Sequence, residues 1–278
     1  MDQANGANPP PYNFQDHGQN NHTGMSYQVV HPAAQTSAQT VDFSLPPDYS
    51  SGLDDIGFSD SNIRRGFIKK VYFTLMLQLL VTVGIICAFL YWSELRVWTW
   101  HNKWFSYTMM AAVMVLVLAL SCCDNLRRQV PLNFIALGLF TVAEGLMLGS
   151  VAAYFDAEAV LWAMLATTLV SLALSLFAFQ SKWDFTMLNG SLWVLMWTLI
   201  SFCLLCAILR SQYVYIVYAC LGTLVFSLYL VFDTQLIVGG KHRKYEMSPE
   251  EYVFAALNLY VDIVSLFLLL LQLIGLCR

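Results

Sequence analysis

The chain begins with a long polar segment and then alternates between apolar runs and short polar connections. From about Arg64 onward there are seven runs of almost purely apolar residues. Each has about the 20 residues that an α-helix needs to cross the roughly 30 Å hydrocarbon core of a bilayer. The pattern predicts an all-α polytopic membrane protein with seven transmembrane helices. The predicted helices are residues 71–92, 105–123, 131–154, 159–179, 188–209, 213–238 and 252–276.

Residues 1–60 form the polar segment, which we expect to be a disordered tail. It contains too few aliphatic side chains to offset the entropy cost of ordering. It also lacks the basic stretch and apolar core of a cleaved signal peptide. Two P-P-x-Y motifs in the tail predict either a ligand for WW domains, such as those of ubiquitin ligases, or a plain soluble tail. The motif residues are Pro9, Pro10 and Tyr12, and Pro46, Pro47 and Tyr49.

The composition agrees with a membrane protein and excludes several other classes. The chain is 58% hydrophobic and only 12% charged, whereas charged residues make up about a quarter of soluble domains. A net charge of -4 gives no sign of a nucleic-acid binder. The seven cysteines lie in or beside apolar runs, so we expect reduced packing residues rather than a disulfide framework. No phosphate loop, metal-ligand cluster or cofactor site is evident in the sequence, and we do not expect an enzyme.

The lysines and arginines predict the orientation of the helices. Ten of the 14 lie in the tail and in the second, fourth and sixth connections, and four lie on the opposite side. Because the side richer in these residues stays in the cytosol, the N-terminus is expected there and the C-terminus outside or in a lumen.

Two acidic residues interrupt the last two apolar runs. Asp233 and Asp262 are expected to lie at similar depths on consecutive helices, in the cytosolic half of the membrane. Acidic residues inside a membrane are rare and mostly functional. Two carboxyls at one site would titrate as a coupled unit, and with nearby oxygens they would bind calcium weakly and transiently. The pair is therefore predicted to be a pH sensor, a cation ligand or both, the alternative being a structural link between helices.

Three other charged residues are candidates for the same site. Glu144, in the middle of the third helix, either lines the same path or has a structural role. Arg127 and Arg128, at the end of the second helix, either anchor that helix at the cytosolic surface or pair with a carboxylate as a latch.

Intramembrane aspartyl proteases also place aspartates on two consecutive helices. Those enzymes carry Y-D and G-x-G-D around the acids, followed by P-A-L. Here Phe232 precedes Asp233, Val261 precedes Asp262, and no P-A-L follows. A protease is therefore disfavoured.

Several segments resemble the transmembrane BAX inhibitor motif family, most closely its Lifeguard branch. They are SCCDNLRRQVPLNFIALGLFT, FAFQSKWDFT, VFSLYLVFDTQLIVGG and SPEEYVFAALNLYVDIVSLF, within a match of about Arg64 to Gly275. The resemblance implies that the seventh helix is surrounded by the others. It also implies a pH-sensing dyad at Asp233 and Asp262, with an arginine at the position of Arg127 that can engage it. It assigns no role to Glu144.

The resemblance implies a pH-regulated calcium leak across membranes of the endoplasmic reticulum or Golgi, with protection against apoptosis. The alternative from another class is a non-conducting membrane adaptor that recruits WW-domain proteins or binds cell-death regulators. Removal of the tail distinguishes the two, because the leak needs only residues from about 60 onward.

Overall fold

The computed structural model of the protein describes residues 47–123, 129, 131–240 and 243–277, and within these ranges it contains helices and no strand. In the described part of the chain, seven helices are long and apolar enough to cross a membrane, as predicted. They are α1 (Pro47–Tyr91), α3 (Lys103–Cys122), α5 (Leu132–Ala152), α6 (Ala157–Gln180), α7 (Asn189–Leu209), α8 (Gln212–Val238) and α9 (Tyr252–Cys277).

The first helix begins earlier than the sequence pattern indicated. The membrane span found within α1 is Asn62–Tyr91, and the helix begins at Pro47, within the segment predicted to be disordered. Proline is favoured at the first position of a helix and acidic residues such as Asp48 are favoured in the first turn, so the local sequence is compatible with this start. Hydropathy does not detect such a start.

A short helix, α2 (Ser93–His101), fills the connection between the first two membrane helices and was not predicted. It lies against the end of α5. Arg96 donates hydrogen bonds to the carbonyls of Ala153 (3.1 Å) and Phe155 (2.9 Å), and Trp100 Nε1 donates to Ala153 O at 2.9 Å. Because the last carbonyls of a helix lack partners within the helix, these contacts cap α5.

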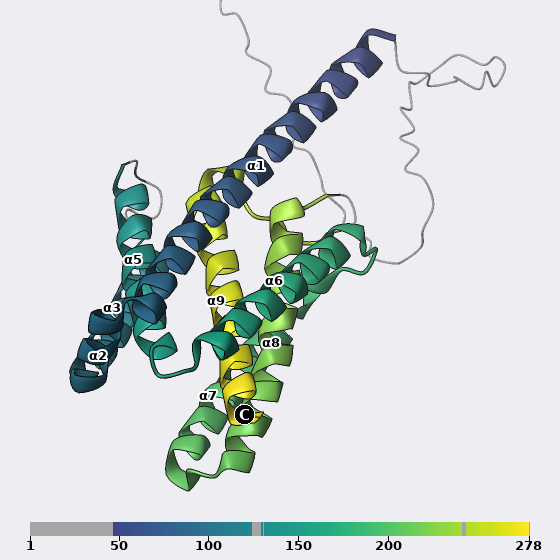
Figure 1. Ribbon diagram of the computed structural model, residues 1–278. Coiled ribbons are helices and arrows are strands. Elements are labelled where there is room, and N and C mark those ends of the chain that lie inside the picture. The colour runs from purple at the N-terminus through teal and green to yellow at the C-terminus, as the bar shows by residue number, and fades with distance from the viewer. Residues whose placement is uncertain (1–46, 124–128, 130, 241–242, 278) are drawn as a thin grey trace, which may run out of the picture. The chain divides into compact units, whose positions relative to one another are not determined.

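The last membrane helix, α9, is surrounded by others, as predicted. It contacts α1, α5, α6 and α8, and Figure 1 shows it, in yellow, between α5 and α8. Tyr260, in its third turn, has no exposed surface. By contrast, only 11% of the most apolar stretch of α3 is buried. The core of the bundle therefore lies along α9 and α5, whose most apolar stretches are 44% and 61% buried.

Two glycines of α5 allow α1 to approach closely. A Cβ at Gly149 would lie 2.6 Å from Phe89 Cδ2, and one at Gly145 would lie 2.7 Å from Ile85 Cδ1. Small residues four apart bring membrane helices together in this way.

We expect Gly149→Leu to lower the unfolding temperature of the protein in detergent, because overpacking costs about 1–3 kcal/mol. Gly138→Leu, in the same helix, is the control, since a Cβ at Gly138 has no atom within 4 Å. Equal unfolding temperatures for the two variants would show that α1 and α5 do not depend on this contact.

Candidate functional site

The structure brings Asp233 and Asp262 together. Asp233 lies near the end of α8 and Asp262 in the third turn of α9, and these two helices share the most extensive contact among the described pairs. The two carboxyls lie within hydrogen-bonding reach of one another. They are 7% and 4% exposed. The expected position on consecutive helices thus produces one buried acidic site.

The surroundings of the aspartate pair are polar but incompletely bonded. Tyr229, one turn before Asp233, is close enough to both carboxyls to interact with them electrostatically, and its hydroxyl donates to Leu192 O of α7 at 2.8 Å. Among the described residues, Asp262 Oδ2 is buried and has no hydrogen-bond partner. The site therefore has an unused carboxylate oxygen, which a proton or a cation can engage.

The third predicted acid, Glu144, lies on another side of α9. It interacts electrostatically with Tyr260, which comes two residues before Asp262. Residues two apart on a helix are separated by about 200°, so Tyr260 and Asp262 face different neighbours. Glu144 is thus buried, at 6% exposure, in a second polar cluster.

Several other predicted residues are not placed. Arg127 and Arg128 lie outside the described residues, so the latch stays a prediction. Pro9, Pro10, Tyr12 and Pro46 also lie outside the described residues, so their role as WW-domain ligands stays a prediction. Pro47 and Tyr49 lie in the first turn of α1, where the backbone is helical rather than polyproline II.

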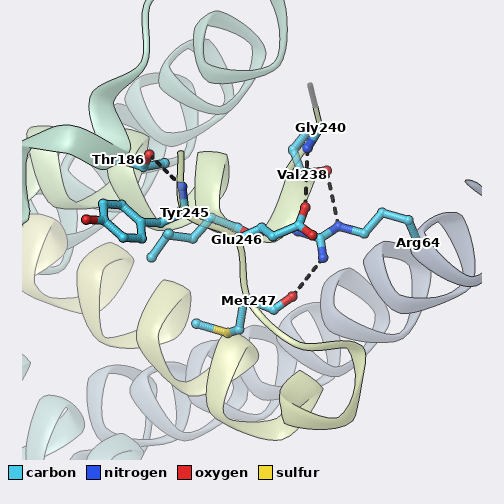
Figure 2. Close-up of polar contacts among 8 residues, drawn as sticks. Arg64, Thr186, Val238, Gly240, Tyr245, Glu246 and Met247 are labelled. Carbon is cyan, nitrogen blue, oxygen red and sulfur yellow. Dashed lines mark hydrogen bonds and ion pairs between the residues drawn. The ribbon is translucent and has the colours of Figure 1, made fainter. Parts of the chain in front are cut away.

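Arg64 fixes the end of α8, a role that the sequence did not reveal. Its guanidinium donates to the carbonyls of Leu236 (2.8 Å), Val238 (3.2 Å) and Met247 (2.7 Å), and it lies 3.7 Å from Glu246 Oε2 (Figure 2). An arginine from α1 thus caps α8 just beyond Asp233 and holds the connection to α9. A cation is favoured there by the helix dipole.

Gly239 makes room for this arginine. Its φ of 58° is in the left-handed region, which glycine adopts at the end of a helix without strain. A Cβ at this position would collide with the Arg64 guanidinium.

A second arginine, Arg243, lies in the connection between α8 and α9 and binds the end of α6 and the connection between α6 and α7. Arg243 donates to the carbonyls of Ala178 (3.2 Å), Ser181 (2.7 Å) and Trp183, which follow or end α6. From α8, Gln235 accepts a hydrogen bond from Phe185 N (2.8 Å) and donates to Trp183 O (3.1 Å). The segment FAFQSKWDFT, singled out by its resemblance, therefore binds the residues directly after Asp233.

Asp184 is part of this arrangement. Its carboxylate accepts hydrogen bonds from Thr186 and, at 2.9 Å, from the backbone of Lys244. Burial alone would raise the pKa of Asp184, but the hydrogen bonds from Thr186 and Lys244 N and the positive charge of Arg243 together outweigh it, so the pKa lies below its ordinary value. The end of α8 is thus fixed from two sides.

Seven membrane helices, of which α9 is surrounded by others, and a buried carboxyl pair between α8 and α9 define a polytopic membrane protein with an intramembrane acidic site. Residues 64–278 match the family described as inhibitor of apoptosis-promoting Bax1 (Bax1-I). The chain belongs to this family, and the predicted resemblance to BAX inhibitor motif proteins is confirmed.

Individual relatives identify the branch. The chain is 36% identical over 262 residues to Protein lifeguard 3 of Homo sapiens, and the alignment covers 88% of this chain and 84% of the relative. It is 37% identical over 222 residues to Protein lifeguard 3 of Mus musculus, with coverage of 78% and 71%. It is 35% identical over 231 residues to the Golgi anti-apoptotic protein of Vaccinia virus (strain Lister), with coverage of 83% and 93%. The predicted similarity to Lifeguard proteins is thus confirmed.

Proposed function

We propose that this protein is a pH-regulated calcium leak channel of endomembranes that restrains apoptosis. The observation that carries the proposal is the meeting of Asp233 and Asp262, buried between α8 and α9. Two adjacent carboxyls away from water cannot both ionise cheaply, so after the first proton is lost the pair shares the second over an intermediate pH range. Loss of that proton leaves an anionic site of carboxylate oxygens, the ligands that calcium prefers.

The pair is suited to passage rather than storage of the ion. Two carboxylates supply fewer oxygens than the about 6–8 that calcium takes in tight sites. Conduction requires binding that is strong enough for entry and weak enough for exit. Arg64 and Gln235 hold the end of α8 in place. A movement of this end relative to α9 would change the distance between Asp233 and Asp262.

Location and cellular role are proposed from the relatives and from charge. One relative is named a Golgi anti-apoptotic protein, and the matched family is described as an inhibitor of apoptosis-promoting Bax1. These names support a Golgi or endoplasmic reticulum membrane and a protective role for this chain. The end of the bundle with Arg64, Lys70 and Arg243, called the basic end below, is proposed to face the cytosol, because such residues favour that side.

Reconstitution tests the proposal directly. Purified full-length protein in liposomes that contain a calcium indicator is expected to release or admit calcium with a midpoint between about pH 5.5 and 8, as a coupled carboxyl pair predicts. Empty liposomes are the control. A correctly folded protein that is silent across this range would overturn the leak, and the adaptor with its tail motifs would then be the function to pursue.

A further inference from the structure

A second buried polar cluster lies between α1, α5 and α9, on the side of α9 away from the aspartate pair. Its members are joined by hydrogen bonds. Gln78 Nε2 donates to Thr141 Oγ1 at 3.0 Å, and the hydroxyls of Thr82 and Tyr260 share a hydrogen bond of 2.8 Å. Glu144 lies one turn after Thr141 and interacts electrostatically with Tyr260. Three helices thus supply polar groups at one place in the bundle.

Two oxygens of this cluster are unused. Within the described residues, Glu144 Oε2 and Gln78 Oε1 are buried and have no hydrogen-bond partner. The two side chains are 6% and 4% exposed. A buried acceptor without a partner costs about 1–3 kcal/mol, and an unpaired buried carboxylate costs more. Two such oxygens in one cluster indicate a missing partner that both can use.

We infer that this cluster is a second binding site for calcium, formed by Glu144 and Gln78 and completed by the hydroxyls of Thr82, Thr141 and Tyr260. A cation satisfies both unused oxygens and the charge of Glu144 at once. The two oxygens of Glu144, the amide oxygen and the three hydroxyl oxygens reach the lower end of the about 6–8 ligands that calcium takes. With only one carboxylate, the site binds weakly.

A groove between α1 and α5 borders the cluster. The groove has a volume of about 520 Å³, is open on one side and mostly apolar, and is lined by Gln78 and Thr141 of the cluster and by Lys70 and Tyr252 at the basic end. Gln78 and Thr141 lie near the middle of the membrane-spanning parts of α1 and α5, as Glu144 does in α5. Gln78 and Thr141 therefore connect the cluster with a groove whose lining does not include the aspartate pair.

The inference deepens the proposed leak and rests on it for its role in transport. Conduction through several weak sites is faster than release from one strong site. Tyr260 and Asp262 are two residues apart, so α9 carries one side of each site on different faces. A displacement of α9 would alter both sites together.

Calcium binding can be tested without transport. In the full-length Asp233→Asn/Asp262→Asn variant, where the first site is removed, calcium chloride is expected still to raise the unfolding temperature in detergent, because a ligand that binds the folded state stabilises it. Adding Glu144→Gln is expected to abolish that stabilisation, or to raise the calcium concentration needed by at least about tenfold, as loss of a ligand-shell group does. Magnesium chloride at equal ionic strength is the control for nonspecific salt effects.

Glu144→Gln keeps the size of the side chain, so it also distinguishes a bound cation from a bound proton. If Glu144 simply holds a proton, glutamine replaces it without loss, calcium stabilisation is the same with and without Glu144→Gln, and the inference is overturned. No calcium stabilisation in the Asp233→Asn/Asp262→Asn variant would overturn it too.

A second variant covers the case in which Glu144→Gln does not fold. Gln78→Leu in the same background is expected to weaken calcium binding while keeping the carboxylate, and full calcium stabilisation in this variant would contradict the site. If the proposed leak is wrong, liposomes with the wild-type protein show no calcium flux. The calcium-binding measurement does not depend on that result.

Discussion

Asp262→Asn is expected to remove the pH dependence of calcium flux between about pH 5.5 and 8, and Asp233→Asn is expected to do the same. Each substitution keeps the size of the side chain and removes one of two groups that share a proton. The remaining carboxyl then has no partner with which to share a proton, so the coupled transition assigned to this pH range cannot occur. Flux from liposomes at a series of pH values, compared with wild type, measures the effect.

Asp156→Asn is the matched control for these variants. It makes the same chemical change at an exposed residue directly before α6, far along the chain from either aspartate. Asparagine is as good a residue as aspartate at the start of a helix, so stability should change little. If Asp233→Asn and Asp262→Asn both keep the wild-type pH midpoint, the carboxyl pair does not gate the flux.

The helices could be predicted because the bilayer imposes a simple rule on the sequence. Every backbone group in hydrocarbon must be bonded within the segment, so a run of about 20 apolar residues specifies a helix. The end of α8 was predicted at Val238, where the structure places it. The amphipathic α2 has no such signal, because it lies outside the apolar runs and is held by Arg96 and Trp100.

The partners of the buried polar residues could be predicted only in part. Asp233 and Asp262 lie on consecutive helices, so a short connection favours their meeting. The neighbours of Glu144 depend on which helices adjoin α5 and on their rotation. Tyr260 and Asp262 occupy the same apolar run, yet one faces Thr82 and the other Asp233. The hydropathy pattern does not show which neighbours these two residues contact, because that depends on how the helices pack.

Arg64 shows the same limit for a charged residue. In the sequence it belongs to the basic run before the first apolar segment and is expected to anchor that helix at the membrane surface. Its partners are backbone carbonyls, which are present at every position and so leave no trace in the residue types. Only the positive φ of Gly239 follows from a visible feature, the glycine pair after Val238.

Arg64→Met is expected to destabilise the end of α8 and the connection that follows. The change removes hydrogen bonds to Leu236 O, Val238 O and Met247 O while keeping most of the apolar stem. A hydrogen bond to a charged group contributes about 1.5–3 kcal/mol, so the loss should be about 2 kcal/mol or more, even with partial replacement by water. Amide hydrogen exchange is expected to accelerate at Gly239 and Met247, whose N–H groups bond to Gln235 O and Leu236 O.

Arg65→Met provides a matched control, because Arg65 is the adjacent residue of α1 and is exposed. Arg64→Lys should restore only part of the protection, since an ammonium group cannot span three carbonyls as the planar guanidinium does. Because Asp233 lies directly before the capped turn, Arg64→Met is also expected to shift the pH midpoint of flux, whereas Arg65→Met is not. Unchanged hydrogen exchange at Met247 in Arg64→Met would show that Arg243 and Gln235 suffice to hold the end of α8, and that α1 does not position the aspartate pair.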